Sequence, residues 1–278
     1  MIDVLVTSGF GQRALVAATV VAAAAPIVGA FLVQRRLSLV GDGIGHLALA
    51  GVALGVLVGV SGLWGALIVA VLGAAGLEAL RVRGRLTGDL SLALIFYLGI
   101  AAGAVGLSLA GRFDTSVLSV LFGSLFALSW ADVGVIALLG ALVVGAVLLV
   151  YRPLLAVALD EETARAAGLP VDLLNLLLVT LTSLLVVGGM RVVGLLLVAA
   201  LMVIPVAAGS KVAHSFRATL GWAVLVGALS AWTGLAVAAW HGELIPGGTI
   251  VLTAIAAFLA FAAVGRRTAV RHVPRREG

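Results

Sequence analysis

Long apolar runs occupy most of this 278-residue chain, and they constrain its fold more than any other feature. Hydrophobic residues make up 63% of the sequence and charged residues only 10%, against about 25% charged residues in ordinary soluble domains. A soluble protein of this size must cover its surface with polar groups, and 17 basic and 12 acidic side chains are too few. The composition therefore argues against a soluble enzyme, a nucleic-acid-binding protein and a disordered chain. It predicts a multi-pass protein of the lipid bilayer.

The runs are long, continuous and rich in Leu, Ala, Val and Gly, which predicts helices and not the alternating strands of a membrane barrel. A helix needs about 20 residues to cross the hydrocarbon core. We therefore expect an all-α transmembrane bundle of about eight or nine spans, forming one domain over residues 1–278. The segment 115–130 is too short to cross comfortably, so we expect a re-entrant or interfacial helix there. The candidate spans are 14–33, 38–60, 62–80, 90–110, 132–150, 173–190, 192–210, 218–240 and 247–265.

The distribution of basic residues predicts which ends of the spans face the cytoplasm. If the spans alternate, Arg13, Arg112 and Arg191 fall on one side, and every other Lys and Arg falls on the opposite side. The side with more Lys and Arg is the cytoplasmic side. This places the C-terminus in the cytoplasm and, for nine spans, the N-terminus outside.

Asp42 and His46 are the polar residues that stand out inside a predicted span. They are four residues apart and therefore share one face of a helix. A carboxylate in hydrocarbon is costly, so it must face a cavity or a partner. One interpretation is a structural pair that satisfies itself; the other is a divalent-cation site, because carboxylate oxygen and imidazole nitrogen suit zinc and manganese. Gly41, Gly43 and Gly45 interrupt this stretch and would let the helix unwind and turn carbonyl groups toward an ion.

Two ligands are too few to enclose a metal ion. A two-fold homodimer whose second spans met at the axis would supply two carboxylates and two imidazoles. Such a sparse, shared site suits a pathway, because an ion that is held too tightly does not leave.

Small residues and proline within the spans give weaker signals. Gly51, Gly55 and Gly59 recur at every fourth position of one span, which predicts close packing against another helix. Pro205 predicts a kink in its helix, either for packing or as part of a gate.

Polar residues near the ends of spans are also informative. Glu78 lies near the end of its span and is expected either to extend its carboxylate toward the membrane surface or to pair with Arg81, three residues later. His241 and Glu243 lie in the predicted external segment HGELIPGG. They are candidates for receiving a metal ion or docking a partner, but a solvated loop is the favoured interpretation.

The largest polar insertion between spans is the loop at about 152–172. Asp160, Glu161 and Glu162 open a short amphipathic helix, with their negative charges near its positive end. Gly168, followed by a proline two residues later, ends this helix. The loop is either a surface connection or a docking helix for a cytoplasmic motor.

The chain does not carry the residues needed to hydrolyse nucleotide. A phosphate-binding loop requires the pattern GxxxxGK[ST], and the single lysine, Lys211, lies in VAAGSKVAH. The driving force is therefore a separate ATPase or an ion gradient, unless the protein is a passive channel.

Five segments in the same order resemble the metal-type ABC transporter permeases, which are membrane subunits of zinc, manganese and iron uptake systems. The resemblance covers nearly the whole chain, and five ordered matches are far more specific than one. The segments are RRLSLVGDGIGHLALAGVALG around Asp42, LFGSLFALSWAD at 121–132, YRPLLAVALDEETARAAGLPVDLLN at 151–175, RVVGLLLVAALMVIPVAAG at 191–209 and LIPGGTIVL at 244–252.

The resemblance implies a function and a set of partners. It implies a second permease copy, expected as a homodimer, two cytoplasmic ATP-binding subunits and an extracytoplasmic metal-binding protein, in a prokaryotic plasma membrane. Asp42 and His46 match the family's pair implicated in metal passage. The stretch from Glu162 to Gly168, which includes Ala166 and Ala167, matches the segment that meets the ATPase.

The expected function is ATP-driven import of a divalent metal, with no enzymatic step in this chain and no permanently bound cofactor. We rank zinc first, manganese second and iron third as the transported ion. The alternatives are an ABC permease for an iron chelate or cobalamin and an ion-coupled secondary metal carrier.

Overall fold

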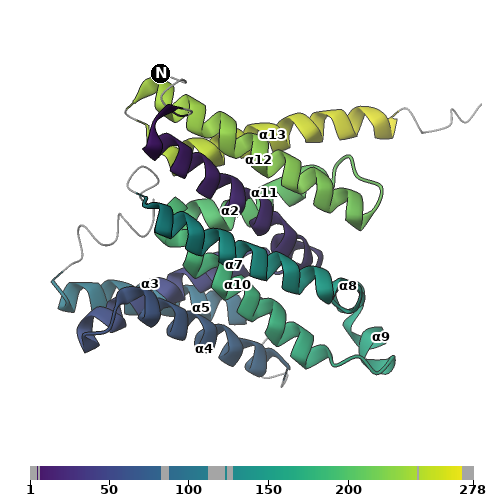
Figure 1. Cartoon of the computed structure of the whole chain (residues 1–278). Coiled ribbons are helices and arrows are strands. Elements are labelled where there is room, and N and C mark those ends of the chain that lie inside the picture. Colours follow the sequence, from purple (N-terminus) through teal and green to yellow (C-terminus); the bar gives the residue numbers. More distant parts are fainter. Residues whose placement is uncertain are drawn as a thin grey trace, which may run out of the picture.

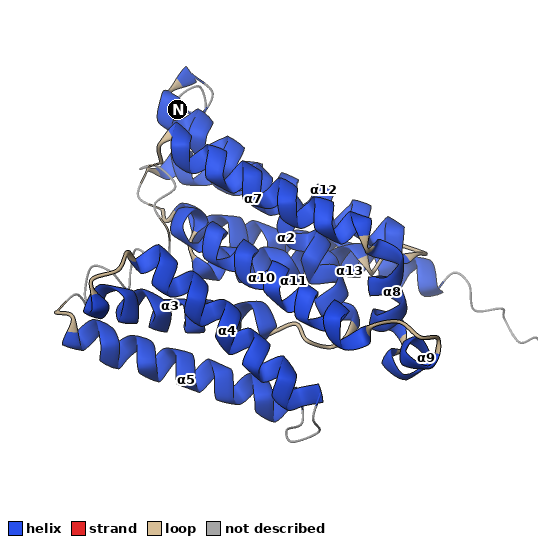
Figure 2. Cartoon of the chain, turned by 60° about the horizontal axis from the view of Figure 1, so that its bottom comes forward, coloured by secondary structure: helices blue, strands red, loops and turns tan. Residues whose placement is uncertain are grey.

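The computed structural model describes residues 5, 7–82, 88–111, 123, 128–242 and 244–270. The described part of the chain is helical and contains no strand (Figures 1 and 2). Among these residues, eight helices are long and apolar enough to cross a membrane, which confirms the prediction of an all-α multi-pass protein. The helices are α2 (Gly9–Gln34), α3 (Val40–Val58), α4 (Gly62–Val82), α5 (Gly88–Leu109), α7 (Trp130–Leu149), α8 (Tyr151–Leu159), α9 (Glu161–Ala166), α10 (Val171–Val193), α11 (Leu195–Gly209), α12 (Phe216–His241) and α13 (Pro246–Val270).

The predicted span 192–210 differs from the other spans. α10 continues to Val193, so the break expected after Met190 is wrong. The chain turns instead at Gly194, whose φ of 86° is accessible to glycine. α11 has only 15 residues, or about 22 Å of helix, which is less than the hydrocarbon core of about 30 Å. α11 packs on α2, α10, α12 and α13, so other helices cover most of it. A segment too short to cross the hydrocarbon core needs such cover, because lipid cannot satisfy the backbone groups at its ends.

Two further expectations for the connecting segments have different outcomes. The predicted re-entrant helix at 115–130 lies almost entirely outside the described residues. The loop at 152–172 contains a helix that the sequence prediction missed, α8, in addition to the expected short helix. Leu154, Val157 and Ala158 form its buried face, and their helical spacing was a usable signal.

The helices form two packed groups. α3 lies between α4 and α5 and contacts both, and this group forms the lower part of the molecule in Figures 1 and 2. α2, α11, α12 and α13 form the second group, and α10 contacts both α4 and α2. α8 and α9 lie together at one end of the bundle.

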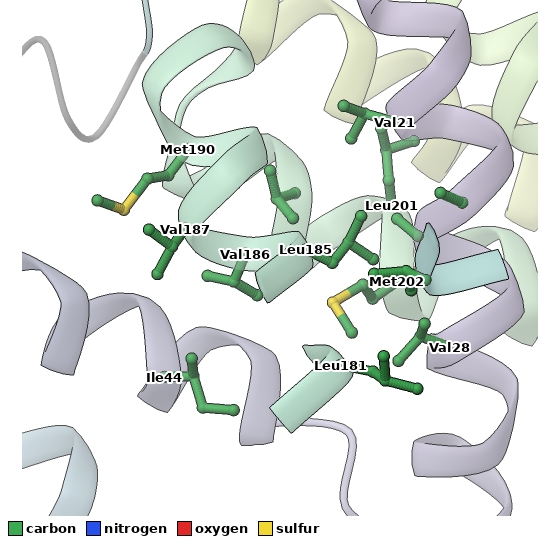
Figure 3. Packing of buried hydrophobic residues seen from close by; sticks show 14 of the residues in the cluster. Val21, Val28, Ile44, Leu181, Leu185, Val186, Val187, Met190, Leu201 and Met202 are labelled. Atoms are coloured by element: carbon green, nitrogen blue, oxygen red, sulfur yellow. The ribbon is translucent and has the colours of Figure 1, made fainter. Parts of the chain in front are cut away.

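The buried core lies where α2, α3, α10 and α11 meet (Figure 3). Within a bilayer there is little hydrophobic drive between apolar helices, so the fit of side chains against one another supplies much of the stability. The labelled core residues include Val21 and Val28 of α2, Ile44 of α3, Leu181 and Leu185 of α10, and Leu201 and Met202 of α11.

The contact between α3 and α4 depends on glycine. A Cβ atom on Gly51 would collide with the carbonyl oxygen of Gly65, and a Cβ atom on Gly65 would collide with that of Gly51. Gly51 and Gly55 therefore pack closely against α4, as their spacing predicts. Gly59 has a different role, because it ends α3 with a φ of 78°.

We expect Gly65→Val to destabilise the protein by about 1–3 kcal/mol, the usual cost of overpacking. Gly76→Val is the matched control, because Gly76 lies on the same helix and a Cβ atom there meets nothing within 4 Å. The midpoint of thermal unfolding in detergent should fall for Gly65→Val and change little for Gly76→Val. Equal shifts would show that helix propensity, and not the close approach of α3, determines the effect.

Candidate functional site

Asp42 and His46 lie one turn apart near the N-terminal end of α3. His46 Nε2 is 3.9 Å from Asp42 Oδ1, and the two side chains are 15% and 26% exposed, respectively. This separation is beyond hydrogen-bonding distance. The two side chains therefore face the same region without satisfying each other, and both keep the capacity to bind a third group.

Helix α5 covers the imidazole of His46. The ring packs edge-on against Phe96, with 4.5 Å between ring centroids. Gly99 allows α5 to approach the backbone of His46, where a Cβ atom would lie 2.6 Å from the carbonyl carbon. Nδ1 of His46 is buried and has no hydrogen-bond partner among the described residues. The ring is thus held in place with Nε2 toward Asp42, an orientation that suits a histidine that ligates a cation.

One copy of the chain does not complete a metal site in its described part. No group of three or more His, Cys, Asp or Glu side chains that could hold a metal ion occurs there. Asp42 and His46 thus supply two of the four to six ligands that a zinc or manganese ion takes.

The sequence suggested that the glycines around Asp42 let the helix unwind, but the structure shows no unwinding there. α3 runs without a break from Val40 to Val58. Each glycine instead leaves space for a side chain from a neighbouring helix, so their physical role here is close packing. The side chains that a Cβ atom would meet are Met202 at Gly41, Ile95 at Gly43 and Leu195 at Gly45.

Other residues proposed from the sequence lie apart from this pair. Pro205 is buried inside α11. His241 is the exposed last residue of α12, and α12 packs on α2, α11 and α13. Glu243 lies outside the described residues. The structure therefore does not bring His241 to the Asp42–His46 pair.

The expected short helix in the polar loop is confirmed as α9. Asp160 is its N-cap and accepts hydrogen bonds from the backbone N–H groups of Glu162 and Thr163, both at 3.0 Å. The backbone N–H and the hydroxyl of Thr163, together with the N–H of Glu162, hold the pKa of Asp160 below its usual value. Ala167 is the C-cap, and Gly168 follows with a φ of 81°. The sequence thus encodes both ends of this helix.

Glu161 attaches α9 to the rest of the bundle. Its carboxylate accepts hydrogen bonds from Arg35 Nη2 at 3.3 Å and from Asn175 Nδ2 at 3.2 Å. Arg81 Nη2 lies 3.4 Å from the Oε2 atom of Glu161. These three partners come from the end of α2, from α4 and from α10, so one side chain ties the loop to three helices.

The arginines that hold Glu161 are themselves buried or paired. Arg81 donates to Glu78 through Nε at 3.0 Å and through Nη2 at 2.7 Å, which confirms the expected pair. The side chain of Arg35 is only 7% exposed, and burial lowers its pKa. The sequence analysis missed Arg35 and Asn175. The signal was weak: a single amide among the apolar residues at the start of α10.

Most other residues of α9, and the two residues that follow it, face outward. Glu162, Ala166, Ala167 and Gly168 are exposed, whereas Ala164 is buried. The two acidic residues at the start of the helix therefore differ in role, because Glu161 points into the bundle and Glu162 points away from it. The outward surface is small, and its charged side chains are Asp160, Glu162 and Arg165.

Residues 8–265 match the model of the ABC 3 transport family. The chain belongs to this family of metal-type ABC transporter permeases. It is 31% identical to the manganese transport system membrane protein MntC of Halalkalibacterium halodurans over 260 residues, which cover 93% of this chain and 89% of the relative. It is 30% identical to the manganese import system permease protein ScaB of Streptococcus parasanguinis over 258 residues, which cover 93% and 91%.

The fold agrees with the same assignment. The structure of PsaBC from Streptococcus pneumoniae in complex with Fab superposes with a TM-score of 0.84 at 29% identity, covering 98% of each chain. This ABC 3 permease is therefore the membrane subunit of a metal-type importer. Its contribution is transport, and ATP hydrolysis resides in a separate subunit.

Proposed function

We propose that this ABC 3 permease forms the pathway by which an ATP-driven importer moves a divalent transition metal, with manganese as the preferred cargo. The observation that carries the proposal is the Asp42–His46 pair. Asp42 Oδ1 and His46 Nε2 lie 3.9 Å apart, too far for a hydrogen bond, and both side chains are partly exposed on one face of α3.

The relatives support manganese ahead of the zinc that we ranked first from the sequence. The two curated relatives described above are named for manganese transport or import. Carboxylate and imidazole ligands accommodate manganese as well as zinc, and the chain contains no cysteine that would favour softer ions. The ligand chemistry therefore permits both metals, and the similarity to relatives named for manganese transport favours manganese.

A homodimer would complete the site. Each copy offers one carboxylate and one imidazole on a partly exposed face of α3, so two copies related by a two-fold axis would offer four ligands. Four ligands of mixed type would bind an ion without enclosing it permanently, which suits passage.

The outward face of α9 would receive the ATP-binding subunit. The helix α9 is short, capped at both ends and attached through Glu161 to three other helices. A force on α9 would therefore reach α2, α4 and α10. In this proposal α8, α9 and the C-terminus lie in the cytoplasm, which agrees with the side predicted from the basic residues. The opposite ends of the spans would receive ions from an extracytoplasmic metal-binding protein.

Uptake by proteoliposomes tests the proposal. With the ATP-binding subunit reconstituted and ATP supplied on its side, we expect accumulation of labelled manganese that stops without ATP or without that subunit. Accumulation driven by an ion gradient in the absence of the subunit would instead show a secondary carrier. Uptake of an iron chelate or cobalamin, but of no free metal ion, would support the other alternative.

A further inference from the structure

A groove of about 500 Å³ lies at the α8 end of the bundle, away from the Asp42–His46 pair. It is formed where α7 ends, α8 begins and α12 begins. Arg152 and Arg217 contribute the charged part of its lining, and Leu148, Leu149 and Leu220 contribute much of the apolar part. The groove thus combines two cations with an apolar wall.

An aromatic cluster holds Arg217 in position. Its guanidinium carbon lies 5.5 Å from the centre of the Tyr151 ring, which is within the range of a cation–π interaction. Tyr151 in turn packs edge-on against Phe31 at 6.0 Å and lies 6.2 Å from Phe216. Because Phe31 is completely buried, Tyr151 packs on the core of the bundle, and its ring offers the exposed Arg217 a fixed surface at the groove.

The positive charge of the groove is not neutralised by the protein in its described part. Within the described residues, neither Arg152 nor Arg217 forms an ion pair, whereas Arg35, Arg81 and Arg165 each have a carboxylate partner. The hydroxyl of Tyr151 is also buried without a hydrogen-bond partner in the same part of the chain. These groups favour an anionic occupant with several acceptor oxygens.

We propose that this groove binds the phosphate headgroup of an anionic phospholipid. Arg152 and Arg217 would hold the phosphate, and the acyl chains would lie along α7. Leu149 and Leu148 at the end of α7 are 87% and 59% exposed, and both adjoin the arginines in the groove lining. An exposed apolar surface that runs into paired cations at the end of a span matches a lipid, which has both parts, better than it matches free phosphate.

Lipid retention by the purified full-length permease tests this site. The protein is exchanged into detergent with either phosphatidylglycerol or phosphatidylcholine, and bound lipid is measured by native mass spectrometry. Near a membrane surface one basic residue changes anionic-lipid binding about fivefold, so Arg152→Gln with Arg217→Gln should weaken phosphatidylglycerol retention about 25-fold. The double lysine variant, R152K with R217K, keeps the charge and should retain most of the lipid.

Arg36→Gln is the matched control, because Arg36 is an exposed arginine directly after α2 and outside the groove lining. It should leave retention within about twofold of the unmodified protein. The proposal is overturned if Arg36→Gln and the groove variant lose lipid equally, or if phosphatidylcholine is retained as well as phosphatidylglycerol. Displacement of the lipid by equimolar inorganic phosphate would identify a free-anion site and would likewise overturn it. Failure of manganese uptake would leave this result unaffected.

Discussion

ATP-driven manganese uptake is expected to fall by about 100-fold when Asp42 is replaced by asparagine. Loss of even a supporting partner of a metal ligand typically costs about 10–100-fold in affinity or activity, and in a homodimer this change removes two charged ligands from one site. Asparagine keeps the shape of the side chain, so the packing of α3 between α4 and α5 should survive. The measurement is the initial rate of manganese uptake into proteoliposomes, with the ATPase activity of the same preparations recorded in parallel.

Asp132→Asn is the matched control for this change. Asp132 lies in the first turn of α7, where its carboxylate accepts hydrogen bonds from Ser129, and asparagine retains an acceptor oxygen. We expect uptake within about twofold of the unmodified rate. Normal transport by Asp42→Asn would mean that the Asp42–His46 pair is structural, and the proposed pathway would have to be abandoned while family membership stands.

The second large effect is expected at Glu161. Glu161→Gln leaves Arg35 buried without a carboxylate partner among the described residues. Removing one member of a buried ion pair costs about 3–5 kcal/mol; because the side chain of Glu161 is 32% exposed, we expect a loss of about 2 kcal/mol in the free energy of unfolding. The weakened attachment of α9 should also reduce binding of the ATP-binding subunit.

Glu162→Gln makes the same chemical change at the next residue. It separates the attachment of α9 to the bundle from the docking of the ATP-binding subunit. Glu162 is exposed, so its replacement should alter stability by less than about 0.5 kcal/mol while still weakening subunit binding if the outward face of α9 is the docking surface. Thermal unfolding and affinity for the immobilised ATP-binding subunit measure the two effects. Equal destabilisation by both variants would refute the anchoring role of Glu161, and unchanged binding in both would refute docking at α9.

The elements of the fold could be predicted because their signals are local. Long uncharged runs specify helices in a bilayer, and both ends of α9 are marked by the N-cap Asp160 and by Gly168, which follows the C-cap. The break at Gly194 was harder to place, because Met190 and the following arginine also suggest an end. α8 was missed because its sequence, YRPLLAVAL, is mostly apolar and follows the end of α7 after a single residue, so no change of pattern marks its start.

The sequence by itself determined that this chain is an all-helical membrane protein, that Asp42 and His46 share a helix face, and that its segments match a metal-type permease. These properties follow from composition and from the period of a helix, and both depend only on residues that are close together in the chain. Only the tertiary structure decided that Glu161 turns inward to Arg35, 126 residues away in the chain, and that the glycines beside Asp42 leave space for neighbouring side chains instead of unwinding α3. The same holds for the groove at Arg152 and Arg217. Such contacts depend on which helices pack together and at what rotation, and no local pattern in the sequence specifies that.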